Sequence, residues 1–243
     1  MRIAFRVDAT IQIGSGHFMR SLTLADELKK QGSQVSFVSR NLPAHLKDML
    51  VTKGIKYTAL NVDHARESSD DLTHSSWLET SQPQDAQATI QSLSDHLWDW
   101  VVVDHYALDE RWEKIVREST KKLMVIDDLA DRIHDCDLLL DQNFYSDMQT
   151  RYSGKVPVHC QLMIGPRYAL LRKEFRKLRE RIKPRVGEVK KILVFFGGVD
   201  ADNYTSQAIG ALYAMNIALH VDVVIGKQHP NRDQVQNACI AHG

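Results

Sequence analysis

The residues best placed to do chemistry form the run Gly14-Ser15-Gly16-His17. The run follows a short apolar segment and opens an amphipathic one, which predicts a turn between a strand and a helix. Glycines at such a turn let a ligand approach the backbone closely, and the first N–H groups of a helix have no partner within the helix. The run therefore predicts a phosphate-binding loop, although a turn that binds nothing fits the same pattern.

His17 is the candidate general base, because a neutral imidazole accepts a proton from water. Its place in the first helical turn favours the neutral form, since the helix dipole disfavours a positive charge there. A bound diphosphate would favour the imidazolium instead. The sequence leaves the protonation state of His17 open, and an incidental histidine remains the alternative.

The loop differs from two common nucleotide-binding loops. Met19 stands where a dinucleotide-binding loop has its third glycine, and the next predicted strand ends in Ser39-Arg40, without the acidic residue that binds a ribose hydroxyl. The chain also has no Gly-x-x-x-x-Gly-Lys-Ser/Thr run. NAD and P-loop ATP hydrolysis are therefore disfavoured, and no cofactor is expected.

Two further polar clusters follow apolar runs, namely Asp104-His105-Tyr106 and Asp127-Asp128. The first is either functional or simply the polar end of a buried strand. Paired aspartates could bind a metal, but acids at a strand end more often cap helices or bond loop amides. The histidines show no metal-binding spacing, so we expect no metal.

Strands and helices alternate along the first part of the chain. A polar surface excursion is expected over residues 63–83. The periodicity predicts strands at 3–7, 34–39, 55–60, 100–103, 123–126 and 137–141, and helices at 17–31, 43–53, 85–97, 109–119 and 168–182. This alternation predicts an α/β doubly wound fold with a parallel sheet. The loops after the strands then meet at one edge of the sheet, where such folds bind ligands.

The pattern breaks at Lys183-Pro184-Arg185 and then restarts. The restart contains a predicted strand at 191–196, a Gly197-Gly198 turn, a helix at 203–215 and a strand at 219–225. We predict an N-terminal sugar-binding and catalytic domain over 1–184. Residues 185–243 would begin a C-terminal nucleotide-binding domain that is incomplete. Two doubly wound domains with glycine turns at facing edges are typical of the GT-B nucleotide-sugar glycosyltransferase fold.

The composition argues against several kinds of partner. Lys plus Arg and Asp plus Glu both total 31, so the formal net charge is zero and no overall field attracts nucleic acid or a membrane surface. No apolar run approaches the ~20 residues that span a bilayer. Three widely spaced cysteines predict buried free thiols in a reducing compartment, and we expect a cytoplasmic protein. The oligomeric state is left open.

Several motifs occur in a fixed order along the chain. They are Phe5-Arg6-Val7-Asp8, Gln12-Ile13-Gly14-Ser15-Gly16-His17-Phe18-Met19-Arg20-Ser21-Leu22, Val103-Asp104-His105-Tyr106, Ile126-Asp127-Asp128, Asp141-Gln142-Asn143, Gly165-Pro166-Arg167-Tyr168-Ala169-Leu170-Leu171 and Phe196-Gly197-Gly198-Val199-Asp200. In this order they resemble the UDP-2,4-diacetamido-2,4,6-trideoxy-β-L-altropyranose hydrolases of pseudaminic acid biosynthesis. The resemblance covers essentially the whole chain.

The resemblance implies a metal-independent hydrolase that releases UDP and the free 2,4-diacetamido sugar, with inversion at the anomeric carbon. It implies that His17 is the general base and that Tyr106 lies near the sugar. The residues expected to bind substrate or phosphate are Gly14, Ser15, Gly16, Gly197, Gly198, Asp8 and Arg20. Arg6 is a further candidate for a structural or phosphate contact.

Two alternatives stay open. One is a UDP-sugar glycosyltransferase with the same fold, in which UDP release depends on an acceptor. The other is a truncated nucleotide-sugar-binding module without turnover. Even where the family resemblance holds, the incomplete second domain leads us to expect that this chain binds UDP poorly.

Overall fold

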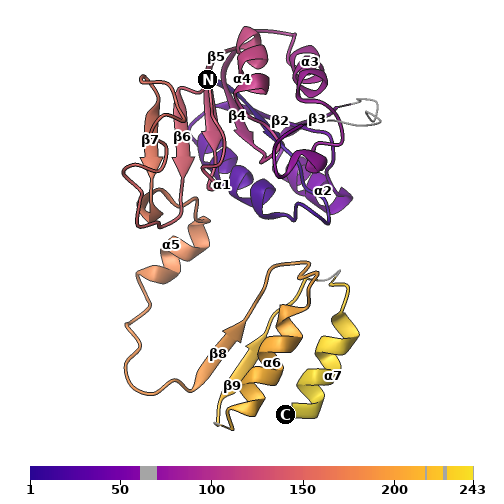
Figure 1. The fold of residues 1–243 in the computed structure, drawn as a ribbon, viewed down its shortest axis with the longest axis vertical. Helices are drawn as coiled ribbons and strands as arrows, with labels where there is room; N and C mark the ends of the chain where they lie inside the picture. Colours follow the sequence, from indigo (N-terminus) through magenta and orange to yellow (C-terminus); the bar gives the residue numbers. More distant parts are fainter. Residues whose placement is uncertain (61–69, 217, 227–228, 243) are drawn as a thin grey trace. The chain divides into compact units, whose positions relative to one another are not determined.

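The computed structural model describes residues 1–60, 70–216, 218–226 and 229–242. The chain forms two compact units, Met1–Arg176 and Lys177–Gly243, and each is built on its own sheet (Figure 1). The domain boundary predicted after residue 184 falls in the irregular segment between α5 (Lys173–Arg179) and β8 (Lys191–Val194). The predicted division into domains 1–184 and 185–243 stays a prediction.

The first unit contains a parallel seven-stranded sheet in the order β3-β2-β1-β4-β5-β6-β7. Its strands are β1 (Arg2–Val7), β2 (Gln34–Ser39), β3 (Lys56–Ala59), β4 (Trp98–Asp104), β5 (Thr120–Ile126), β6 (Leu138–Asp141) and β7 (Gln161–Ile164). The apolar runs of β1 and β4 are buried along almost their whole length, as expected for strands covered on both faces. The predicted α/β class is confirmed.

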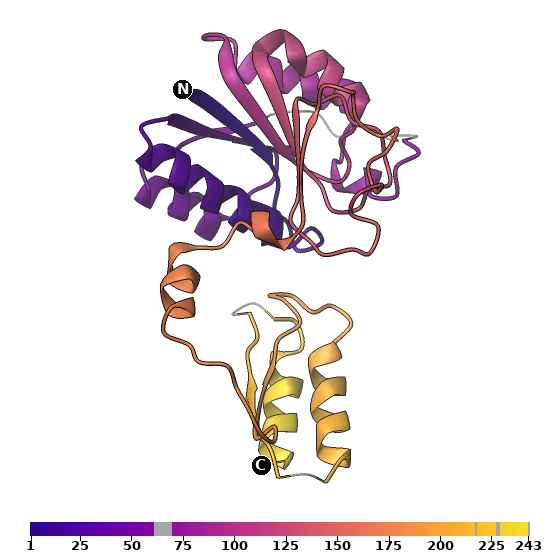
Figure 2. The same cartoon turned by 90° about the vertical axis from the view of Figure 1, so that its left-hand side faces the viewer.

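Helices cover both faces of this sheet (Figure 2). They are α1 (Gly16–Lys30), α2 (Ala44–Thr52), α3 (Gln82–Ser92) and α4 (Glu110–Val116), with short 3₁₀ turns η1 (Ser75–Trp77), η2 (Arg117–Ser119) and η3 (Pro166–Tyr168). Alternate residues of β1 face opposite cores, because Phe5 packs with α1 and α2, whereas Ala4 packs with α3 and α4. The two cores fix the sheet between two helical layers.

The strand register brings the predicted site loops to one edge. Val7 pairs with Asp104 at the ends of β1 and β4, and Val103 pairs with Val125 of β5. The chain passes from β1 to β2 on one side, while β4 lies on the other side of β1. The site loops therefore meet at the point where the strand order reverses, as predicted for a doubly wound sheet.

Several predicted elements differ from the structure in their boundaries, and two observed elements were not predicted. The polar excursion 63–83 lies partly outside the described residues, but from residue 70 onward it contains η1 and packs against the sheet edge. Helix α3 begins at Gln82 because Ser81 and Gln84 form a capping box, which the sequence reading missed. Strand β7 and helix α7 (Arg232–His242) were not predicted, and the helix expected over 168–182 is confined to α5.

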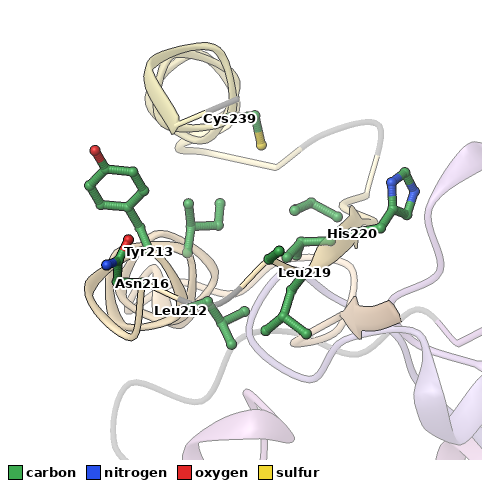
Figure 3. A pocket seen from close by; sticks show the side chains of 10 residues that line it. Leu212, Tyr213, Asn216, Leu219, His220 and Cys239 are labelled. Atoms are coloured by element: carbon green, nitrogen blue, oxygen red, sulfur yellow. The ribbon is translucent and has the colours of Figure 1, made fainter. Parts of the chain in front are cut away.

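The second unit pairs β8 with the parallel strand β9 (His220–Val223) and adds α6 (Tyr204–Ala214) and α7. A pocket of about 610 Å³ opens between α6, β9 and α7 (Figure 3). Leu212, Leu219 and Cys239 are among the side chains that line it. Among the described residues that line it, none is a predicted site residue.

None of the described helices is long and apolar enough to cross a membrane. The cytoplasmic location expected from the sequence stays a prediction. The cysteines are free, as expected, but they are not all buried: Cys136 is buried, Cys160 is half-buried and Cys239 is exposed.

Candidate active site

The glycine loop forms the turn that the sequence predicts. Gly14 has a φ of +75°, which favours glycine, and its N–H donates to the carbonyl of Thr10 at 2.8 Å. Helix α1 begins at Gly16, and the Ser15 side chain makes no capping hydrogen bond to the helix in the described structure. No heavy atom lies within 4 Å of a Cβ built on Gly14 or Gly16. The loop therefore presents open backbone at a helix N-terminus, which suits an anion.

His17 is held by a carboxylate from the neighbouring strand. Its Nδ1 lies 2.5 Å from Oδ1 of Asp104, the last residue of β4, and both side chains are largely buried. Because an ionised carboxylate only accepts, we assign the proton to Nδ1, which makes Nε2 the proton-accepting nitrogen of the neutral ring. With this tautomer the Arg20 Nη2 group, 3.3 Å from Nδ1, is a neighbour and not a hydrogen-bond donor to the ring. Among the described residues, the side-chain hydrogen bond of His17 is the one from Nδ1 to Asp104, so Nε2 remains for a ligand.

Two more side chains of α1 bind the same carboxylate. Arg20 donates to Asp104 through Nε and Nη2, both at 2.7 Å, and Ser21 donates through Oγ at 3.1 Å. Residues 17, 20 and 21 share one helix face because they are three and four positions apart. Burial alone would raise the pKa of Asp104, but the charge of Arg20 and the hydrogen bonds from Arg20 and His17 hold that pKa well below its usual range. Asp104 is therefore a fixed anion.

Tyr106 lies against His17 and is fixed by a second aspartate. The two rings meet edge to face with centroids 4.4 Å apart. The Tyr106 hydroxyl donates to Asp128, which also accepts from Arg20 at 2.9 Å and from Asn143 at 3.0 Å. Burial, followed by the hydrogen bond and charge of Asp128, raises the pKa of Tyr106 above its usual value of 10. Tyr106 is therefore a neutral phenol at physiological pH.

Two aromatic side chains from the segment before α3 complete the surroundings of His17. The Trp77 ring is edge-on to His17 at 6.3 Å and stacks on Tyr106 at 5.7 Å. His74 contacts Trp77 and Tyr106, with centroid distances of 4.4 and 5.5 Å. Sequence reasoning missed both residues, because their polar neighbours made the segment read as a surface excursion.

Asp8, predicted to contact substrate, lies beneath the site instead. Its side chain is 0% exposed, and Arg6 Nη1 and His105 Nε2 lie 2.8 and 3.3 Å from its two oxygens. Arg6 also binds Asp85 of α3 through Nε and Nη2, at 3.0 and 2.6 Å. These contacts favour a supporting role for Asp8, whose side chain is fully buried, and the predicted substrate contact stays a prediction. Arg6 is likewise structural.

Arg20 was predicted to contact substrate or phosphate. In the structure its guanidinium donates instead to Asp104 and Asp128. Asp127 accepts from the Ala130 amide at 2.9 Å and pairs with Arg132 at 2.9 Å. Within the described parts of the chain, no group of three His, Cys, Asp or Glu side chains could hold a metal ion. These contacts favour a positioning role for Arg20 and give both aspartates of the 127–128 pair protein partners.

Gly197 and Gly198 follow β8 in the second unit. Gly197 has a φ of +83°, and Asp200 accepts from the amides of Tyr204 and Thr205 at the start of α6, at 2.9 and 2.8 Å. This is the predicted glycine turn before a helix. These glycines belong to the second unit, and their role in binding stays a prediction.

The structure gathers His17, Tyr106, Arg20 and the Gly14–Gly16 loop in the first unit. It adds Asp104 and Asp128 as the groups that hold them, together with Asn143. The spacing of His17, Arg20 and Ser21 on one helix face, opposite a predicted strand ending in aspartate, is the signal that could have identified the role of Asp104.

Two curated proteins are similar to this chain over nearly its whole length. "Uncharacterized protein MJ1062" of Methanocaldococcus jannaschii is 26% identical over 241 residues, which are 98% of this chain and 45% of that protein. The UDP-2,4-diacetamido-2,4,6-trideoxy-beta-L-altropyranose hydrolase of Campylobacter jejuni is 28% identical over 243 residues, which are 100% of this chain and 76% of that protein. The chain thus spans less than half of the first relative. No protein-family model matches it.

Among solved structures, MurG of Acinetobacter baumannii superposes with a TM-score of 0.54 at 14% identity, over 98% of this chain and 63% of MurG. CalG4, the calicheamicin glycosyltransferase, gives a TM-score of 0.48 at 13% identity, over 95% of this chain and 67% of CalG4. At such low identity the likeness to MurG concerns the fold alone. The chain therefore resembles the Campylobacter UDP-sugar hydrolase from end to end and has an α/β fold of the GT-B glycosyltransferase kind.

Proposed function

We propose that this protein hydrolyses a UDP-linked 2,4-diacetamido-2,4,6-trideoxy sugar to UDP and the free sugar, as a step of pseudaminic acid biosynthesis. The full-length similarity to the Campylobacter hydrolase supports the choice of substrate. The observation that carries the reaction type is the pairing of His17 Nδ1 with the buried Asp104 carboxylate. That pairing leaves Nε2 to act on water.

In the proposed reaction, a water oxygen attacks the anomeric carbon while His17 Nε2 takes one of its protons. The bond between that carbon and the phosphate oxygen breaks, and UDP leaves with the electron pair. Attack from the face opposite the leaving group inverts the anomeric configuration. Asp104 holds the ring in one tautomer and balances the charge of the imidazolium that forms, as the buried aspartate does in a Ser-His-Asp triad.

The leaving diphosphate needs hydrogen-bond donors and no strong acid. The amides at the N-terminus of α1, which begins at Gly16, provide donors aligned with the helix dipole. Tyr106 donates to Asp128, so its oxygen keeps lone pairs that can accept from an acetamido N–H of the sugar. We propose that the reaction needs no metal, because the side chains of Asp127 and Asp128 already bind arginines, a tyrosine and the Ala130 amide.

The test is UDP release from the UDP-trideoxy sugar by the purified chain in ¹⁸O-labelled water, with no acceptor present. We expect ¹⁸O in the free sugar and none in UDP, unchanged turnover with EDTA, and loss of turnover in His17→Asn. Label in UDP, or full activity of His17→Asn, would overturn the mechanism.

A UDP-sugar glycosyltransferase is the second candidate, favoured by the fold shared with MurG. It predicts that UDP release requires an added acceptor and that the sugar appears on that acceptor. UDP release in water alone, with the free sugar as product, excludes it. Binding of the UDP-sugar without turnover, with or without acceptors, would instead identify a binding module.

A further inference from the structure

We infer that His74, Trp77 and Tyr106 form an aromatic wall that selects sugars with an apolar, deoxygenated face at the His17 site. This inference rests on the proposed function. It deepens that function by assigning sugar selection to residues of the segment between β3 and α3.

The rings of the wall contact one another and the His17 ring in stacked and edge-to-face arrangements. Trp77 and Tyr106 are nearly parallel, with an interplanar angle of 28°, and each meets the His17 ring almost at a right angle, at 82° and 80°. His74 touches both of them. All three wall residues are half-buried, so none of them is fully enclosed by the protein. A ligand reaching His17 therefore meets aromatic surface.

The segment that carries Trp77 is held at both ends. Leu78 is buried, and its carbonyl accepts from Arg40 at 3.2 Å. Glu79 has a φ of +56° and accepts from Asn41 at 3.1 Å, just after β2. These contacts tie the wall to the same edge of the sheet as His17.

The other end of the segment is tied to α3 and α4. Asp70 accepts from Gln82 and from Arg111, both at 2.9 Å. Gln82 in turn accepts from the Asp109 amide, next to α4, at 3.1 Å. Anchoring on three neighbouring elements is what a preformed binding surface needs, since a fixed ring loses little entropy when it stacks on a ligand.

The chemistry of the wall favours one class of sugar. Aromatic faces gain free energy by covering C–H and methyl groups. A hydroxyl turned toward the rings would instead lose its water without gaining a partner. The proposed substrate carries a C6 methyl and two acetyl methyls, whereas a common N-acetylhexosamine carries a C6 hydroxyl and one acetyl group. We therefore expect the wall to discriminate between them by roughly tenfold, the usual size for such a difference in an apolar site.

The test measures binding of two free sugars by NMR titration, without any turnover. The probes are the free 2,4-diacetamido-2,4,6-trideoxy sugar and N-acetylglucosamine. We expect the wild-type chain to bind the first roughly tenfold more tightly, Trp77→Ala to lose most of that preference, and Trp77→Phe to keep most of it. Trp100→Phe is the matched control, because Trp100 is another half-buried tryptophan, near the opposite end of β4.

If Trp77 served only in packing, Trp77→Ala would bind both sugars more weakly, and the ratio of the two affinities would stay unchanged. The proposed selectivity of the wall would be refuted by equal affinity of the wild type for the two sugars. It would also be refuted by an undiminished affinity ratio in folded Trp77→Ala. If Trp77→Ala does not fold, a small loss of the affinity ratio in Trp77→Phe, with no loss in Trp100→Phe, supports the wall. Equal affinity of the wild type for the two sugars still refutes it. A preserved ratio without UDP release would refute the hydrolase and leave the wall standing.

Discussion

At the residue scale, one carboxylate organises the candidate site. Asp104 binds His17, Arg20 and Ser21, which come from two successive turns of α1. It sits at the end of β4, next to the end of β1 in the register of the sheet. Its charge therefore holds the Nδ1 side of the histidine ring and leaves Nε2 for the proposed reaction, which makes Asp104 a positioning residue.

Replacing Asp104 by asparagine removes that charge while keeping the shape. We expect Asp104→Asn to lower kcat by at least about 100-fold with little change in KM, because the amide stabilises the wrong tautomer and cannot balance an imidazolium. Steady-state kinetics of UDP release measure both constants. Ser21→Ala is the matched control, since it removes a different hydrogen bond to the same carboxylate and should change kcat less than tenfold. Equal losses in the two variants would contradict the positioning role.

Tyr106 offers a prediction in pH. Burial, with Asp128 beside it, raises the pKa of Tyr106 above 10, so the phenol stays protonated throughout the range from pH 7 to pH 10. Tyr106→Phe should therefore lower kcat/KM by the same factor at pH 7 and at pH 10. The measurement is the pH profile of UDP release for both proteins. A wild-type rate that falls toward the Tyr106→Phe rate as the pH approaches 10 would mean that the phenol ionises there, against this expectation.

At the scale of elements, the two glycines of the loop before α1 have different roles. Gly14 has a positive φ, so Gly14→Ala should cost about 1–2 kcal/mol of stability. Gly16 lies at the helix start with open space around it, so Gly16→Ala should change stability by less than about 0.5 kcal/mol. If a phosphate approaches this backbone, Gly16→Ala should still weaken UDP binding by roughly tenfold or more. Urea denaturation and calorimetry make the two measurements, and unaltered UDP affinity in Gly16→Ala would argue against the loop as a phosphate site.

The same scale shows why parts of the molecule could be predicted from sequence. An apolar run such as that of β4 can be recognised as a buried strand from its own residues. Because β1 and β4 are parallel, the residues that follow or end them, Gly16 and Asp104, come to the same edge of the sheet. The positions of Trp77 and Asp8 could not be predicted in this way. Trp77 depends on long-range anchors at Asn41 and Arg111. The burial of Asp8 depends on His105, which follows β4 and is far from Asp8 in the sequence.

At the scale of the whole molecule, the two units differ in how much apolar surface they bury. In the second unit, the buried apolar side chains among the described residues are Val194, Ile209 and Val235, whereas the first unit has two extensive cores. A unit of this size buries only roughly 60% of the surface that its unfolded chain exposes, so its stability is small. We therefore expect the second unit to unfold first.

The tryptophans allow this order to be observed. All four, Trp77, Trp98, Trp100 and Trp112, lie in the first unit, so tryptophan fluorescence follows that unit alone. Far-UV circular dichroism also records α6 and α7 of the second unit. During urea denaturation, we expect part of the helical signal to disappear before the fluorescence changes, because two independent units need not share one transition. Coincident curves would show instead that the units unfold cooperatively, and the second unit would then draw its stability from the first.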